Sequence, residues 1–108
     1  MTLIASPSNP RISKVRTLLT ARGRKKSGLF LMEGPNLLEA LLAAQIVPYE
    51  VYYQPMLLQR TARGTTLLDR LQQLSTLPHD CLIEVSERVI EAISEAGGEL
   101  VHVLEEQR

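Results

Sequence analysis

The sequence between Arg22 and Pro35 passes from basic residues to apolar residues and then to a turn, and this order constrains the fold of the whole chain. It begins with a dense group of basic side chains, continues with the apolar residues 29–32, and ends at Gly34-Pro35. The apolar run is too short for a helix and predicts a buried strand, whereas Pro35 suits the first position of a following helix. We therefore expect the basic group to lie on a loop whose far end is fixed in the core, a common position for binding residues.

Predicted helices and strands alternate through the rest of the chain. Asn9-Pro10 is a helix start, and we expect this helix to reach residue 21 and to end at Gly23. Thr66 and Ser86 are expected to cap two later helices. Further helices are expected over residues 35–45, over residues 67–74 and from Ser86 to a stop at Gly97-Gly98, and further strands over residues 50–53, 81–85 and 100–104.

This alternation is typical of an α/β fold, in which helices connect parallel neighbouring strands by right-handed crossovers. We predict a three-layer α/β/α sandwich with a mostly parallel sheet of about four strands. With 108 residues, the chain is expected to form one domain over residues 1–108. The helix over residues 35–45 is expected to be largely covered, because one face of it is a leucine stripe made of Leu37, Leu38, Leu41 and Leu42.

Charge is distributed unevenly along the chain, although twelve basic and twelve acidic residues cancel overall. Residues 1–28 contain no acidic residue, and the remainder contains twelve acids against five arginines. A basic N-terminal part on an acidic chain indicates a polyanionic partner, most simply nucleic acid, and the alternative is a solvated basic surface without a partner. The basic residues of this part are Arg11, Lys14, Arg16, Arg22, Arg24, Lys25 and Lys26.

Catalytic and metal-binding patterns are not apparent in the sequence. His79 and His102 are isolated, so we predict no metal site, and no glycine-rich nucleotide motif occurs. Cys81 is the only cysteine, and the sequence shows neither a signal peptide nor an apolar run of membrane-spanning length, so we expect a cytoplasmic protein without membrane contact. Glu33 and Gly34, at the end of the first predicted strand, are candidates for a turn contact or a substrate contact.

The ordered motifs along the chain resemble a known family. Ser8-Asn9-Pro10-Arg11-Ile12, the basic segment leading into Phe30-Leu31-Met32-Glu33-Gly34, and the later Val51-Tyr52 and Val85-Ser86-Glu87 are similar to the N-terminal substrate-binding domain of SpoU (TrmH-type) RNA 2′-O-ribose methyltransferases. The similarity covers residues 4–104. It implies a fold like that of the ribosomal proteins that bind kinked RNA, and a role in holding ribosomal or transfer RNA.

In this family a C-terminal knotted domain binds S-adenosylmethionine and transfers the methyl group. Its motifs do not occur in these 108 residues, so the resemblance implies an RNA methyltransferase as the parent protein but no catalytic residue and no cofactor here. It also implies a candidate homodimer formed through that absent domain. Gly97-Gly98 departs from the Pro-Gln-Gly turn common in the family.

RNA contact is predicted for the basic residues, through phosphates rather than bases. Phe30 is expected in the core and the tyrosines lie on or near another strand, so the aromatic residues do not predict a stacking platform. The predicted contact residues are Arg11, Lys14, Arg16, Arg22, Arg24, Lys25 and Lys26. A free-standing RNA-binding or protein-interaction domain without an enzyme remains the alternative, whereas a strand after the basic helix disfavours a DNA-binding helix-turn-helix.

Overall fold

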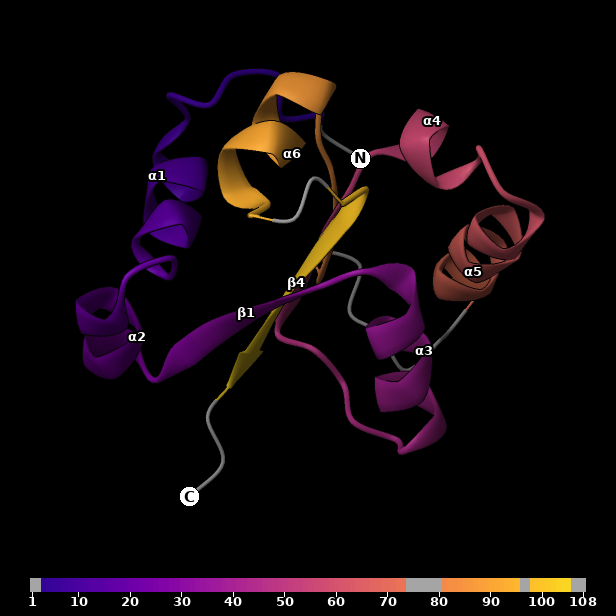
Figure 1. Ribbon diagram of the computed structural model, residues 1–108, viewed down its shortest axis with the longest axis horizontal. Coiled ribbons are helices and arrows are strands. Elements are labelled where there is room, and N and C mark those ends of the chain that lie inside the picture. Colours follow the sequence, from indigo (N-terminus) through magenta and orange to yellow (C-terminus); the bar gives the residue numbers. More distant parts are fainter. Residues whose placement is uncertain (1–2, 74–80, 96–97, 106–108) are drawn as a thin grey trace.

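The computed structural model describes residues 3–73, 81–95 and 98–105 (Figure 1). The helices among these residues are α1 (Pro10–Thr17), α2 (Ala21–Ser27), α3 (Pro35–Ala43), α4 (Pro55–Leu58), α5 (Ala62–Gln73) and α6 (Glu87–Ile93). The strands are β1 (Leu29–Glu33), β2 (Glu50–Tyr53), β3 (Leu82–Glu84) and β4 (Leu100–Glu105). They form one sheet in the order β1-β4-β2-β3. The predicted α/β class is therefore confirmed.

The prediction of a mostly parallel sheet is wrong, because β4 enters the middle of the sheet. It pairs antiparallel with both β1 and β2, and only β2 and β3 are parallel. The one parallel pair among the described strands is β2 and β3, which are consecutive in the chain and joined by a helical crossover. The burial of β4 agrees with its central place, since every residue from Leu100 to Leu104 is buried.

Alternate residues of the central strands face two separate hydrophobic clusters. Tyr52, Val101 and Val103 pack in a first core with apolar residues of α1 and α6. Val51 and Leu100 pack in a second core with apolar residues of α3, α4 and α5. In Figure 1, α1 and α6 accordingly lie on one side of the strands and α3 and α5 on the other. Strand β1 lies at the sheet edge and is only half-buried, whereas a buried strand was expected.

The basic segment forms the short helix α2, so the prediction of a loop is wrong. The first helix ends at Thr17, and Thr20 starts the next one by accepting a hydrogen bond from the Gly23 amide at 3.1 Å. Gly23 lies inside α2, and Gly28 ends it with a left-handed backbone at φ +73°. Arg24, Lys25 and Lys26 occupy its last turn, where cations interact favourably with the helix dipole.

Two other helices also differ from expectation. In α3 only Leu38 is fully buried, and Leu37 is 44% exposed, so the predicted leucine stripe does not cover that helix. Helix α5 begins at Ala62, earlier than predicted, because Thr61 rather than Thr66 accepts the early amide hydrogen bond, from Gly64 at 2.9 Å. The residues Leu74, His79 and Gly97 lie outside the described residues.

Candidate nucleic-acid interface

The seven basic residues predicted for RNA contact lie on two consecutive helices, three on α1 and four on α2, and all are exposed. Among the described residues, the two ion pairs are Arg11–Glu50 and Arg63–Glu39. Within that part of the chain, six of the seven basic residues therefore have no acidic partner. Helices α1 and α2 together present a dense, largely uncompensated positive surface.

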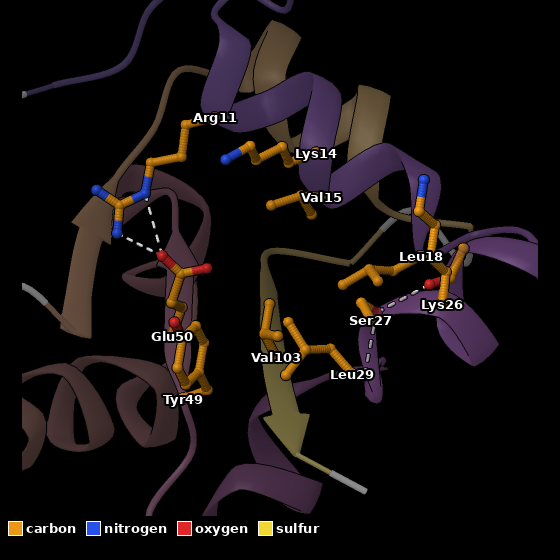
Figure 2. Close-up of a pocket in the computed structure, with 11 residues that line it drawn as sticks. Arg11, Lys14, Val15, Leu18, Lys26, Ser27, Leu29, Tyr49, Glu50 and Val103 are labelled. Atoms are coloured by element: carbon orange, nitrogen blue, oxygen red, sulfur yellow. Dashed lines mark hydrogen bonds and ion pairs between the residues drawn. The ribbon is translucent and has the colours of Figure 1, made fainter.

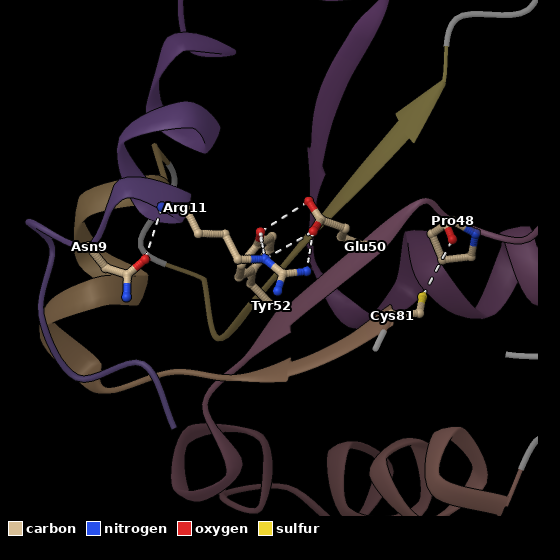
Figure 3. Close-up of polar contacts among 6 residues, drawn as sticks. All are labelled: Asn9, Arg11, Pro48, Glu50, Tyr52 and Cys81. Atoms are coloured by element: carbon tan, nitrogen blue, oxygen red, sulfur yellow. Dashed lines mark hydrogen bonds and ion pairs between the residues drawn. The ribbon is translucent and has the colours of Figure 1, made fainter. Parts of the chain in front are cut away.

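Within the described ranges, Arg11 is the one residue of this group with a neutralising partner (Figure 3). Its Nε donates hydrogen bonds to Glu50 Oε2 at 3.1 Å and to the Tyr52 hydroxyl oxygen at 3.2 Å. The Tyr52 hydroxyl in turn donates to Glu50 Oε1 at 3.0 Å. Burial raises the pKa of Tyr52 above its usual value, so the phenol keeps the proton that it donates. Arg11 thus joins α1 to β2.

Arg24 also has a contact within the protein. Its Nη1 donates a hydrogen bond to the Leu18 carbonyl oxygen at 3.0 Å. Leu18 follows directly after α1, where helix carbonyls lack partners within the helix. Arg24 therefore ties α2 to the end of α1, which fixes the relative position of the two basic helices.

A pocket of about 670 Å³ lies between the two basic helices and the sheet (Figure 2). Lys14 and Lys26 border it on the helix side, and Tyr49 and Glu50 border it where the chain enters β2. Apolar residues form its inner surface: Val15, Leu18, Leu29 and Val103. Of the predicted contact residues, this pocket brings together Arg11, Lys14 and Lys26, whereas Arg24 lines a separate pocket on β1 with Phe30 and Leu31.

Glu33 and Gly34 hold turns at the opposite end of β1. The Glu33 carboxylate accepts hydrogen bonds from the Ser94 hydroxyl and, at 3.0 Å, from the Glu95 amide, which fixes the segment after α6. Gly34 precedes α3 with φ +98°, and its amide donates to the Leu100 carbonyl oxygen at 3.1 Å. Both residues therefore contact turns within the protein, and a substrate contact stays a prediction.

Other residues considered for chemistry are structural or isolated in the described part of the chain. There, no three His, Cys, Asp or Glu side chains gather as metal ligands would, and no helix has the length and apolar character to cross a membrane. Cys81 is buried, with its Sγ 3.5 Å from the Pro48 carbonyl oxygen (Figure 3). His102 is fully buried in β4, and burial lowers its pKa to about 4.

Sequence reasoning missed Tyr49 and Glu50 as parts of the site. Glu50 is separated from Arg11 by 39 positions, and no motif joins the two. Tyr49 was placed near a strand, but its side chain is 54% exposed beside the pocket. In the sequence, Tyr49 stands directly before Glu50, the charged first residue of a predicted strand, and this position was the only indication that it belongs to a site.

The fold is that of a substrate-binding domain, as comparisons with known proteins show. Residues 9–97 match the family model described as the MRM3-like substrate binding domain. The chain belongs to this family, and the resemblance to the SpoU substrate-binding domain is confirmed. No curated protein matches the chain at a significant level.

Solved structures with the same fold are RNA methyltransferases. An RNA 2′-O-ribose methyltransferase is 25% identical and superposes with a TM-score of 0.77 over 99% of this chain and 38% of its own. An rRNA methyltransferase from Sinorhizobium meliloti is 20% identical, with a TM-score of 0.67 over 99% of this chain and 37% of its own. The SpoU methyltransferase AviRb from Streptomyces viridochromogenes, in complex with AdoMet, is 17% identical, with a TM-score of 0.69 over 93% of this chain and 36% of its own. The chain thus spans well under half the length of these proteins.

Proposed function

We propose that this chain binds RNA and positions it for 2′-O-ribose methylation by a catalytic domain outside these 108 residues. The observation that carries the proposal is the family match over residues 9–97 together with the uncompensated positive charge on α1 and α2. The RNA is ribosomal or transfer RNA, and the methyl donor of the whole protein is S-adenosylmethionine. AdoMet bound to two of the structural neighbours supports that donor.

Phosphate binding is the chemistry that the basic surface supports best. Lys14, Arg22, Lys25 and Lys26 are exposed and without an acidic partner in the described part of the chain, so each can reach a phosphate without breaking an ion pair. Neutralising phosphates releases condensed counterions, which drives binding and makes it weaken steeply as salt rises. The hydrogen bond from Arg24 to the Leu18 carbonyl oxygen fixes the orientation of α2 relative to α1. Less conformational entropy is therefore lost when RNA binds.

The pocket beside these helices does not fit S-adenosylmethionine. The sulfonium centre of this molecule is cationic, and Arg11, Lys14 and Lys26 line the pocket. The one carboxylate there, on Glu50, is already hydrogen-bonded to Arg11 and Tyr52. We therefore derive no catalytic step on this chain and assign its role to the RNA substrate.

The proposal is tested by fluorescence anisotropy with a structured RNA at several salt concentrations. The variant Arg22→Ala/Lys25→Ala/Lys26→Ala removes three exposed charges and leaves the Arg24 contact intact. We expect weaker binding to every RNA sequence and a salt slope reduced by about two to three, since each lost phosphate contact removes roughly one from the slope.

The matched control is Arg60→Ala/Arg70→Ala/Arg88→Ala, which removes three exposed arginines outside the N-terminal helices. We expect its salt slope to equal that of the parent chain. An unchanged slope in the N-terminal variant with a reduced slope in the control would move the RNA site away from α1 and α2 to the arginines removed in the control. Absence of RNA binding by the parent chain would overturn the proposal.

A further inference from the structure

The pocket between α1, α2 and the sheet combines an apolar inner surface, an exposed aromatic side chain and two lysines. Phosphate binding alone requires only the lysines. Its inner surface is apolar, and the side chains of Val15 and Leu18 there are buried. Tyr49 stands at its border with 54% of its surface exposed. Lys14 and Lys26 approach its opening from two different helices (Figure 2). This combination differs from a solvated basic surface, in which no apolar recess is expected.

We propose that this pocket takes one unstacked nucleotide of the RNA, with the base against Tyr49 and the apolar inner surface and the neighbouring phosphates at Lys14 and Lys26. The inference rests on the proposed RNA-binding function and names the feature of the RNA that the chain recognises. The pocket lies where β1 and β2 begin, at the opposite end of β1 from Glu33.

The shape and lining of the pocket suit a nucleobase. A volume of about 670 Å³ lies within the range of small-ligand pockets, which are mostly apolar with a few fixed polar groups. The backbone of Tyr49 is fixed beside β4, because its amide donates a hydrogen bond to the Val103 carbonyl oxygen at 2.8 Å. Its exposed aromatic ring offers a stacking surface to any base, since every base has a π face.

The charges around the pocket favour a nucleotide over an uncharged aromatic ligand. Arg11 is engaged by Glu50 and Tyr52, and these contacts form one wall of the pocket. Lys14 and Lys26 have no acidic partner in the described part of the chain, so they remain available to the phosphates on either side of the base.

Only an unpaired nucleotide can enter such a pocket. The apolar surface lies beneath α1 and α2, out of reach of a base that is stacked within a duplex. Bases in bulges and loops can be turned outwards, and proteins commonly stack them on aromatic side chains. The pocket therefore selects RNA that presents an unpaired nucleotide next to a helical stem.

The test compares three RNA hairpins by fluorescence anisotropy: one fully paired, one with a single bulged uridine in the stem, and one with an abasic residue at the bulge. The last two have the same number of phosphates and differ only in the base. We expect the uridine bulge to bind about tenfold tighter than the abasic bulge, because stacking one base on an aromatic ring is worth about this factor. Tyr49→Leu should remove this difference, and Tyr49→Phe should retain it.

Lys26→Ala and Lys25→Ala form a matched pair on α2, since Lys25 does not line the pocket. Lys26→Ala should weaken binding of the bulged RNAs more than that of the paired RNA, and Lys25→Ala should weaken all three equally. Circular dichroism of each variant confirms folding. If Tyr49→Leu unfolds, a photocrosslinking experiment on the parent chain takes the place of this variant. A hairpin with 5-bromouridine at the bulge is irradiated in the complex, and we expect the crosslink on Tyr49.

Three results would overturn the inference. Equal affinity of the parent chain for the uridine and abasic bulges would show that the pocket reads no base, and the proposed function would stand because RNA is still bound. A crosslink confined to residues outside the pocket would have the same meaning. Failure to bind any of the three hairpins would overturn both the inference and the proposed function.

Discussion

The imidazole of His102 is buried in the centre of the sheet, and no described residue is a hydrogen-bond partner for its ring nitrogens. His102 lies in β4 opposite Met32 of β1 and Val51 of β2, and neither ring nitrogen has a hydrogen bond in the described part of the chain. Burial disfavours the charged form and lowers the pKa of His102 to about 4. A neutral ring in the folded chain and a readily protonated ring in the unfolded chain make stability depend on pH.

We expect the free energy of unfolding to fall as the pH is lowered from about 6.5, the ordinary histidine pKa, to about 4. Above pH 6.5 both states are neutral and the stability is full, whereas below it the unfolded chain binds a proton that the folded chain excludes. The expected loss between pH 7.5 and pH 5 is about 2 kcal/mol. Urea unfolding at both pH values measures it. His102→Leu should largely remove the loss, and an equal loss in that variant would assign it to other groups.

At the scale of elements, the joint between α1 and α2 is set by one close approach. A Cβ atom added to Gly23 would lie 2.0 Å from the Thr17 carbonyl oxygen, a backbone atom that a side-chain movement cannot relieve. Gly23 was expected to end a helix, but it allows α2 to begin directly beside the end of α1. The same joint places Lys26 opposite Lys14 across the pocket.

Gly23→Ala should therefore destabilise the protein although alanine is the better helix former. Either helix must shift to accept the methyl group, and such overpacking costs about 1–3 kcal/mol. Chemical denaturation of Gly23→Ala and of Lys25→Ala, an exposed position on the same helix, measures the difference. We expect Lys25→Ala to unfold near the parent midpoint. A Gly23→Ala variant as stable as Lys25→Ala would show that the joint tolerates the added atom.

Local signals made several elements predictable, and contacts between distant residues made others unpredictable. Asn9, Gly34-Pro35 and Ser86 marked helix starts correctly, because capping and proline geometry depend on a few adjacent residues. The insertion of β4 between β1 and β2 depends on pairing across the whole chain, and alternation of elements does not encode it. The pocket likewise depends on the approach of residue 49 to α1 and α2, so the sequence indicated its lysines but not its apolar surface.

At the scale of the whole molecule, positive and negative charge are separated along the chain. The N-terminal helices α1 and α2 carry seven of the twelve basic residues, and all twelve acidic residues follow residue 28. An RNA approaching the acidic remainder is repelled, so the charge distribution orients the encounter as well as strengthening it. The net charge of zero therefore conceals an uneven distribution of charge along the chain.

The chain alone is expected to bind RNA and to show no binding of S-adenosylmethionine. The physical reason is the charge match: the described pocket beside α1 and α2 is bordered by cations, which suit phosphate and repel a sulfonium. The 25% identical methyltransferase is also covered over only 38% of its length, which leaves room for a cofactor site elsewhere in such proteins. Isothermal titration calorimetry with S-adenosylmethionine should give no binding heat, while the bulged RNA titrated into the same sample gives a saturable signal and confirms that the protein is folded. Micromolar binding of S-adenosylmethionine, or a change in RNA affinity when it is added, would contradict the assignment of this chain to the RNA substrate alone.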